Sequence, residues 1–202
     1  MTLRAGALTG LMNQPSAQVI DGSLRFDGTQ SQYLKKTFSS AGNRRTWTWS
    51  YWCKRTRFAD DNTYHYILST RNSSSDRHYF AFNADVDDKL LMYDHTSSNN
   101  KLTETAASYR DSFAWYNVVV VFDTTQSTDS DRLKFYVNGE FINEFDTNQK
   151  SGLNHQGLIN NNVQNNIGGE PNADQYFHGY MSQCYFIDNQ ALGPENFGFT
   201  DP

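Results

Sequence analysis

The residues of this chain that could act in catalysis are acidic side chains in one short segment. Glu140, Glu144 and Asp146 lie close together in the sequence. Two carboxylates that flank a glycosidic bond can act as general acid and as base or nucleophile. Glu140 directly follows the turn pair Asn138-Gly139, so we expect these carboxylates on the surface of a hairpin. The segment therefore predicts no catalytic site.

Other catalytic signatures are missing from the sequence. It contains no G-x-S-x-G, no H-E-x-x-H and no glycine-rich phosphate loop. The histidines are spread without the spacing of metal ligands, and we expect solvated or hydrogen-bonded imidazoles. They are His65, His78, His95, His155 and His178. We therefore expect no catalytic residues and a protein that is not an enzyme.

Two acidic segments could hold calcium. Calcium takes six to eight oxygen ligands, usually from several segments of a chain. Acidic turns are also ordinary surface features of β proteins, so both interpretations stay open. The candidate ligands are Asp85, Asp87 and Asp88 in NADVDD, and Asp129 with Asp131 in a later loop. We expect no other cofactor.

Aromatic side chains near predicted loop ends could form a glycan-binding site. Such sites combine an aromatic platform with hydrogen-bonding side chains, but a tyrosine in so aromatic a chain can equally belong to the core. The candidates are Tyr64, Tyr66, Tyr93, Tyr109, Tyr176 and His178.

Composition excludes several classes of function. The net charge is −5, which argues against a nucleic-acid partner because such a protein needs a basic face. No apolar stretch approaches the roughly 18 residues that a membrane span needs, and the N-terminal apolar segment is short for a signal peptide. Aromatic residues make up 15% of the 202 residues, enough for large rings to fill a core.

The stretch 115–145 sets the fold class. Residues 118–122 form a β-branched and aromatic run, which fits a strand covered on both faces. Leu133, Phe135 and Val137 then alternate with polar or amphipathic residues, the period of a half-buried strand. Asn138-Gly139 suits a type I′ turn. The stretch predicts three consecutive antiparallel strands.

The remaining strands are predicted from similar patterns. Residues 23–26, 46–54, 64–69, 78–83, 89–94 and 177–187 read as strands, and residues 102–112 read as an extended edge segment. Trp47, Trp49, Phe122, Phe135 and Val137 should lie in the core. We expect an all-β, two-sheet antiparallel sandwich of about 12 to 14 strands. An N-terminal arm at 1–22, the sandwich at 23–198 and a tail at 199–202, possibly continuing into an absent region, complete the predicted organisation.

The two cysteines, Cys53 and Cys184, lie far apart in the sequence and do not form a disulfide framework. Both stand in strand-like segments, and we expect them buried and unpaired. Cys184 follows Met181 by three residues, so it can point inward only if a β-bulge lies near residues 182–183.

Five stretches, in order, resemble the concanavalin A-like lectin/glucanase sandwich in its laminin G-like and pentraxin-like form. They are SLRFDGTQSQYL, TWTWSYWCKR, AWYNVVVVFD, LKFYVNGEFI and FHGYMSQCYFIDNQAL. The resemblance implies a jelly-roll sandwich over nearly all of residues 23–198. Hydrolases of this kind carry E-x-D-x-x-E on one strand, and this chain has no such string.

Three sequence segments are similar to segments of virion structural proteins of tailed bacteriophages. They are SAGNRRTWTWSYWCKR, AWYNVVVVFDTTQSTDSDRLKFYVNG and FIDNQALGPENFG. This resemblance implies a particle-surface, tail-fibre or decoration protein located in the virion. Its partners would be other virion subunits, further copies of itself and a host-surface glycan. The alternatives are a tailspike-like polysaccharide-degrading enzyme and a free soluble lectin.

Overall fold

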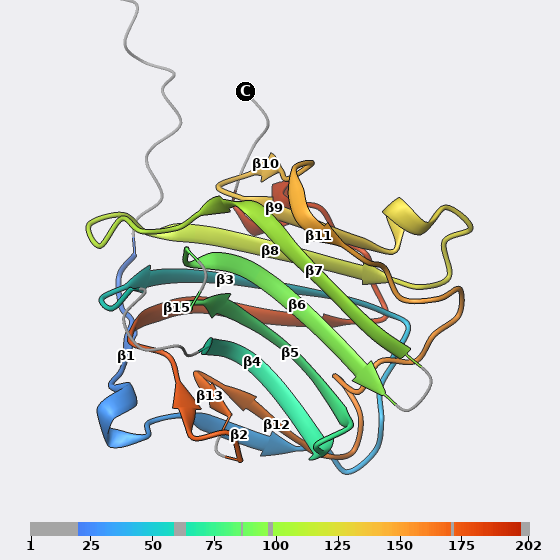
Figure 1. The fold of residues 1–202 in the computed structure, drawn as a ribbon, viewed down its shortest axis with the longest axis horizontal. Coiled ribbons are helices and arrows are strands. Elements are labelled where there is room, and N and C mark those ends of the chain that lie inside the picture. Colours follow the sequence, from blue (N-terminus) through green and yellow to red (C-terminus); the bar gives the residue numbers. More distant parts are fainter. Residues whose placement is uncertain (1–19, 59–63, 86, 97–98, 171, 199–202) are drawn as a thin grey trace, which may run out of the picture.

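The computed structural model describes residues 20–58, 64–85, 87–96, 99–170 and 172–198. The predicted arm at 1–22 lies almost wholly outside these residues, and the predicted tail at 199–202 lies wholly outside them. The described chain is an all-β sandwich, which confirms the predicted fold class. Figure 1 shows the two main sheets layered on one another, with β4 to β7 over β3, β8 and β15.

The first sheet has six strands in the order β1-β15-β3-β8-β9-β10. Every neighbouring pair in it is antiparallel. Its central strands are the apolar runs identified in the sequence. The bounds are Leu24–Phe26 (β1), Gly179–Asp188 (β15), Thr46–Arg55 (β3), Tyr116–Asp123 (β8), Leu133–Val137 (β9) and Glu140–Phe141 (β10).

The second sheet has seven strands in the order β11-β7-β6-β5-β4-β12-β2, again antiparallel. A hairpin of β13 and β14 lies beside β4. The bounds are Phe145–Asn148 (β11), Asn99–Ser108 (β7), Lys89–Thr96 (β6), Asp76–Asn83 (β5), Tyr64–Ser73 (β4), Gln164–Ile167 (β12), Leu34–Thr37 (β2), Gly169–Glu170 (β13) and Gln175–Tyr176 (β14).

Short 3-10 helices complete the described elements, and no described helix is long and apolar enough to cross a membrane. Their bounds are Gly28–Gln30 (η1), Asp129–Asp131 (η2) and Pro194–Phe197 (η3).

The core lies between the inner faces of the two sheets. All five core residues named from the sequence are buried, with Trp47, Phe122 and Phe135 fully inaccessible. The alternation in β3 and β9 aims every second side chain at the opposite sheet, where Phe80 and other residues of β5 meet them. The register assigned from the sequence is therefore confirmed.

Two turns explain how the chain changes direction. Asn138 and Gly139 have φ values of 53° and 85° and join β9 to β10, as a type I′ turn requires. Gly168 has a φ of 82°, and a Cβ atom there would lie 2.4 Å from the Phe26 ring. Gly168 thus allows β12 to end against β1 and to turn directly into β13.

Several details differ from the sequence prediction. The described residues form 15 strands rather than 12 to 14, because two-residue strands such as β13 and β14 are too short to show an alternation. The predicted edge segment at 102–112 overlaps β7, and the edge prediction is wrong because β11 pairs with β7 on its outer side. The third strand predicted after Asn138-Gly139 is split, since Phe145 starts β11 in the other sheet.

Both cysteines are free, and Cys53 is buried as predicted. Cys184 is exposed, so the expectation that it is buried is wrong. The predicted bulge is present, with a register shift between Ser182 and Tyr185 and a φ of 46° at Gln183. The bulge shifts the register of β15 but does not bury Cys184. At this sheet edge β15 is flanked only by the short strand β1.

Candidate functional site

The outer face of the seven-stranded sheet carries a row of tyrosines. The rings of Tyr64 and Tyr66 on β4 contact the ring of Tyr79 on β5, and Tyr79 pairs with Tyr93 on β6. The ring centroids of Tyr66 and Tyr79 are 4.7 Å apart, and those of Tyr79 and Tyr93 are 5.3 Å apart. Residues two apart on a strand share a face, and antiparallel pairing brings these strands into register. The row therefore follows directly from the hairpins β4-β5 and β5-β6.

A cavity of about 390 Å³ opens over this row. Arg77 lies at one side, with its guanidinium carbon 5.1 Å from the centroid of the Tyr93 ring. The hairpin β13-β14 borders the other side through Ala173 and Gln175, and Leu102 of β7 completes the lining. We call the surface of Tyr64, Tyr66, Arg77, Tyr79 and Tyr93 the tyrosine face.

The hydroxyl groups of Tyr66 and Tyr79 remain protonated near neutral pH. Burial raises the pKa of Tyr66 to about 12 and also raises the pKa of Tyr79. A protonated phenol can both donate and accept a hydrogen bond. The face therefore combines apolar ring surface with two-way hydrogen bonding, the chemistry that suits a sugar with its C–H faces and hydroxyls.

Further polar groups lie at one end of the tyrosine face. Asn83, opposite Tyr64 in the register, donates from Nδ2 to Glu104 Oε1 at 2.7 Å. Its Oδ1 is buried without a hydrogen-bond partner among the described residues, as is the Nε of Arg77. Unsatisfied buried polar atoms are costly, and of these two residues only Arg77 lines the cavity.

The structure brings together three of the six glycan-site candidates, Tyr64, Tyr66 and Tyr93. Tyr176 lies in the bordering hairpin, where its ring meets Tyr33 at 6.1 Å. The other two lie elsewhere. Tyr109 is buried in the main core against Phe82, and the ring of His178 lies 5.3 Å from that of His65.

Arg77 and Tyr79 were missed by the sequence reasoning. The alternation of β5 contains the signal, because Arg77 and Tyr79 share a face with Ala81 and Asn83. Pairing β5 with its neighbours would have placed Tyr79 diagonal to Tyr66 on β4 and opposite Tyr93 on β6, with Arg77 two residues further along the same face.

The acidic calcium candidates face cations rather than one another. Asp88 forms a buried ion pair with Arg55, with Nη2 and Oδ1 2.6 Å apart, and also pairs with the partly exposed Arg110. Asp87 is exposed and pairs with Arg110. Within the described ranges, no group of three or more His, Cys, Asp or Glu side chains could hold a metal ion. Calcium binding thus gains no geometric support from these residues.

The remaining acidic candidates are also dispersed. Asp131 pairs with Lys134 at 2.9 Å, and its neighbour Asp129 lies in the same 3-10 helix η2. Asp85 is exposed at the turn after β5. Glu140 and Asp146 are exposed on different sheets, where Asp146 pairs with Lys89.

A second polar cluster is buried where the long connection at 149–163 meets β5 and β6. Ser151 Oγ donates to Asp94 Oδ2 at 2.6 Å, and His155 Nε2 lies 2.9 Å from the same oxygen. His78 Nδ1 lies 3.7 Å from Asp94 Oδ1. Because the serine hydroxyl donates to the carboxylate and not to an imidazole, the cluster lacks the nucleophile–base pair of a hydrolase. Its role is to fasten the connection to the sheet.

Acidification should weaken the fold through this cluster. Burial lowers the pKa of His78 from 6.5 to about 4. The unfolded chain therefore binds a proton at His78 below about pH 6.5, whereas the folded chain does so only near pH 4. The contribution to stability is full above pH 6.5 and declines as the pH falls, by about 3 kcal/mol at pH 4.

Urea unfolding at pH 7 and pH 4.5 would measure this loss. The matched variant His78→Gln has no imidazole to titrate at this position and should show a shallower pH dependence. An identical pH dependence in the two proteins would contradict the assignment to His78.

The comparisons with known proteins agree with this architecture. A family model described as the concanavalin A-like lectin/glucanases superfamily matches residues 27–196. Comparison with curated proteins finds no match.

Solved structures share the fold at low sequence identity. A heptameric SAP-like pentraxin from Limulus polyphemus is 19% identical with a TM-score of 0.55, over 82% of this chain and 73% of that chain. The NanB sialidase of Streptococcus pneumoniae, as a K499G mutant, is 12% identical with a TM-score of 0.59, over 89% of this chain and 27% of that chain. A CBM40 of the Ruminococcus gnavus IT-sialidase, bound to α2,3-sialyllactose, is 15% identical with a TM-score of 0.51, over 82% and 96%.

These structures support the fold alone, since all are under 25% identical. The family model, in contrast, covers most of the sequence, from η1 to η3. The chain therefore belongs to the concanavalin A-like lectin/glucanase superfamily.

Proposed function

We propose that the tyrosine face binds glycans and that the chain is a non-enzymatic component of a bacteriophage virion. The observation that carries the glycan proposal is the row of four tyrosines beneath an open cavity of about 390 Å³. Sugar rings pack their C–H faces on aromatic rings, while the phenol hydroxyls and Arg77 meet their hydroxyl or acidic groups. A fold alone does not define a function, so the proposal depends on this surface.

Two of the structures that share the fold suggest the ligand and the assembly by analogy. One of them was solved with sialyllactose bound, and another is a pentraxin that is heptameric. By analogy we propose a carbohydrate ligand for this chain and assembly with further copies or other virion subunits. The proposed virion location depends on the similarity of three sequence segments to phage structural proteins.

Loss of a tyrosine from the face should weaken glycan binding. Tyr93 is only partly buried, so Tyr93→Ala removes a stacking surface with little effect on the core. We expect affinity for the best ligand found on a glycan array to fall by about tenfold or more. The matched control is Tyr136→Ala, on β9 of the other sheet, which should bind as the wild type does.

Equal losses in Tyr93→Ala and Tyr136→Ala would contradict the placement of the site. A reducing-sugar release assay on the same glycans separates binding from cleavage, and we expect no release. Antibody labelling of intact particles tests the virion assignment. A protein found only free in the lysate would favour a soluble lectin.

A further inference from the structure

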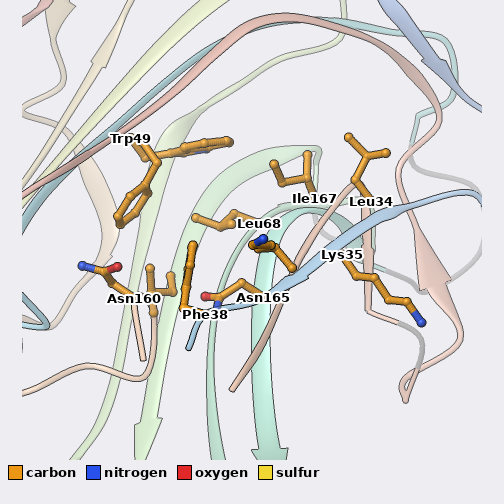
Figure 2. Close-up of a pocket in the computed structure, with 11 residues that line it drawn as sticks. Leu34, Lys35, Phe38, Trp49, Leu68, Asn160, Asn165 and Ile167 are labelled. Atoms are coloured by element: carbon orange, nitrogen blue, oxygen red, sulfur yellow. The ribbon is translucent and has the colours of Figure 1, made fainter. Parts of the chain in front are cut away.

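A second cavity lies between the two sheets, away from the tyrosine face. Its walls are apolar side chains from both layers, and Figure 2 shows them converging on one space. Trp49 and Phe186 come from the six-stranded sheet. Leu68, Ile167 and Leu34 come from the inner face of the seven-stranded sheet. The cavity therefore opens at the edge where β2 closes the sandwich.

This cavity is large enough for a small apolar ligand. It measures about 280 Å³ and opens to solvent beside β2. Its apolar walls offer water few hydrogen-bond partners, so an apolar ligand is favoured there over water. Leu34 borders the opening, and its side chain is 47% exposed, so apolar surface contacts solvent there.

The rim of the cavity is cationic. Lys35 and Lys36 of β2 border it, and neither has an ion-pair partner among the residues that the structure describes. The register pairs Lys36 with Asn165 and Lys35 with Asn166. Because side chains alternate along the strand, Lys36 and Leu34 share the side that faces the cavity, and Figure 2 shows the Lys35 side chain extending away from it.

Two asparagines also border the cavity but are already engaged. Asn160 donates from Nδ2 to Asp188 Oδ1 at 2.7 Å, and Asn165 donates from Nδ2 to the Val163 carbonyl at 2.8 Å. Their amide groups thus hold the long connection in place. The rim offers an incoming anion the amine of Lys36.

We propose that this cavity binds a monocarboxylate with an apolar chain, the chain between Trp49 and Leu68 and the carboxylate at Lys36. The apolar walls match the chain, and the unpaired cationic rim matches the charge. A cavity of about 150 Å³ holds benzene, so about 280 Å³ suits a chain of roughly ten to twelve carbons. This site is independent of the proposed glycan site on the outer face.

Fluorescence quenching with decanoate that carries bromine on its last carbon would test this proposal on the full chain. Bromine quenches only an indole that it contacts, and Trp49 lines the cavity. We expect saturable quenching in the wild type. In Trp49→Phe the quenching should be lost while calorimetry still detects binding.

The contribution of charge is tested with two matched lysine variants. Lys36→Glu should weaken decanoate binding by about tenfold or more. Lys101→Glu, on β7 at the opposite side of the seven-stranded sheet, should bind as the wild type does. Ile167→Phe, which fills the cavity, should abolish binding.

Equal binding by Lys36→Glu and Lys101→Glu would overturn the proposal. Absence of saturable quenching in the wild type would also overturn it and would point to a different occupant, such as residues 1–19 of the chain or a second copy. Because glycan binding is measured separately at the tyrosine face, failure here leaves that proposal intact.

Discussion

Replacing Asp88 with asparagine should lower the free energy of unfolding by about 3–5 kcal/mol. Asp88 and Arg55 are fully buried, and their ion pair is 2.6 Å long. The Arg55 guanidinium also donates to the Tyr109 carbonyl at 2.8 Å and lies 4.2 Å from the centroid of the Phe82 ring. None of these neutral partners can balance its charge, so Asp88→Asn leaves a buried cation without its counter-ion.

Asp87→Asn is a close control for this experiment. Asp87 and Asp88 are neighbours, both have positive φ values near 60°, and both pair with Arg110. Asparagine tolerates that backbone conformation, so neither substitution adds strain. Asp87 is 61% exposed, and losing an exposed ion pair should cost less than about 1 kcal/mol.

Chemical denaturation would measure both variants, with a fall in the midpoint at an unchanged m-value as the expected result for Asp88→Asn. A second substitution that removes the charge, Arg55→Met in the Asp88→Asn background, should recover part of the loss. Similar stabilities for Asp87→Asn and Asp88→Asn would show that the buried pair contributes little.

Local patterns in the sequence were enough for the central strands of the fold. The run in β8 and the alternation in β3 and β9 each identify a strand and the face that it buries. Asn138-Gly139 identifies the turn because few residue pairs adopt positive φ at both positions. These features depend on neighbours in the sequence, so they are visible without the structure.

Features that depend on distant pairing could not be predicted in this way. Phe145 continues the local pattern, but β11 crosses to the other sheet because it pairs with β7. Whether Asp88 would ligate a metal or pair with an arginine depends on Arg55, which is distant in the sequence.

The candidate site was predictable in part for the same reason. Tyr64 and Tyr66 share a face because they lie two residues apart on β4. Tyr109 follows the end of β7, where alternation no longer indicates direction, and its ring turns into the core. Arg77 and Tyr79 become part of the site through the pairing of β5 with both β4 and β6.

Replacing Trp47 with alanine should also cost about 3–5 kcal/mol. Trp47 is fully buried and joins the two sheets through its ring contacts. Its ring stacks on Phe122 at 4.9 Å, meets Phe80 edge-on at 5.9 Å and lies 5.6 Å from Phe186. Since β3 is paired on both edges, the backbone around Trp47 cannot collapse into the space that the ring leaves.

The matched control for this substitution is Phe141→Ala. Phe141 is 51% exposed on the short strand β10, so its removal should change the free energy of unfolding by less than about 1 kcal/mol. Thermal and urea unfolding of the two variants would give the comparison. Among the described rings, only that of Trp47 contacts Phe80, Phe122 and Phe186 together. A Trp47→Ala protein as stable as Phe141→Ala would therefore show that this ring cluster between the sheets contributes little to the stability of the sandwich.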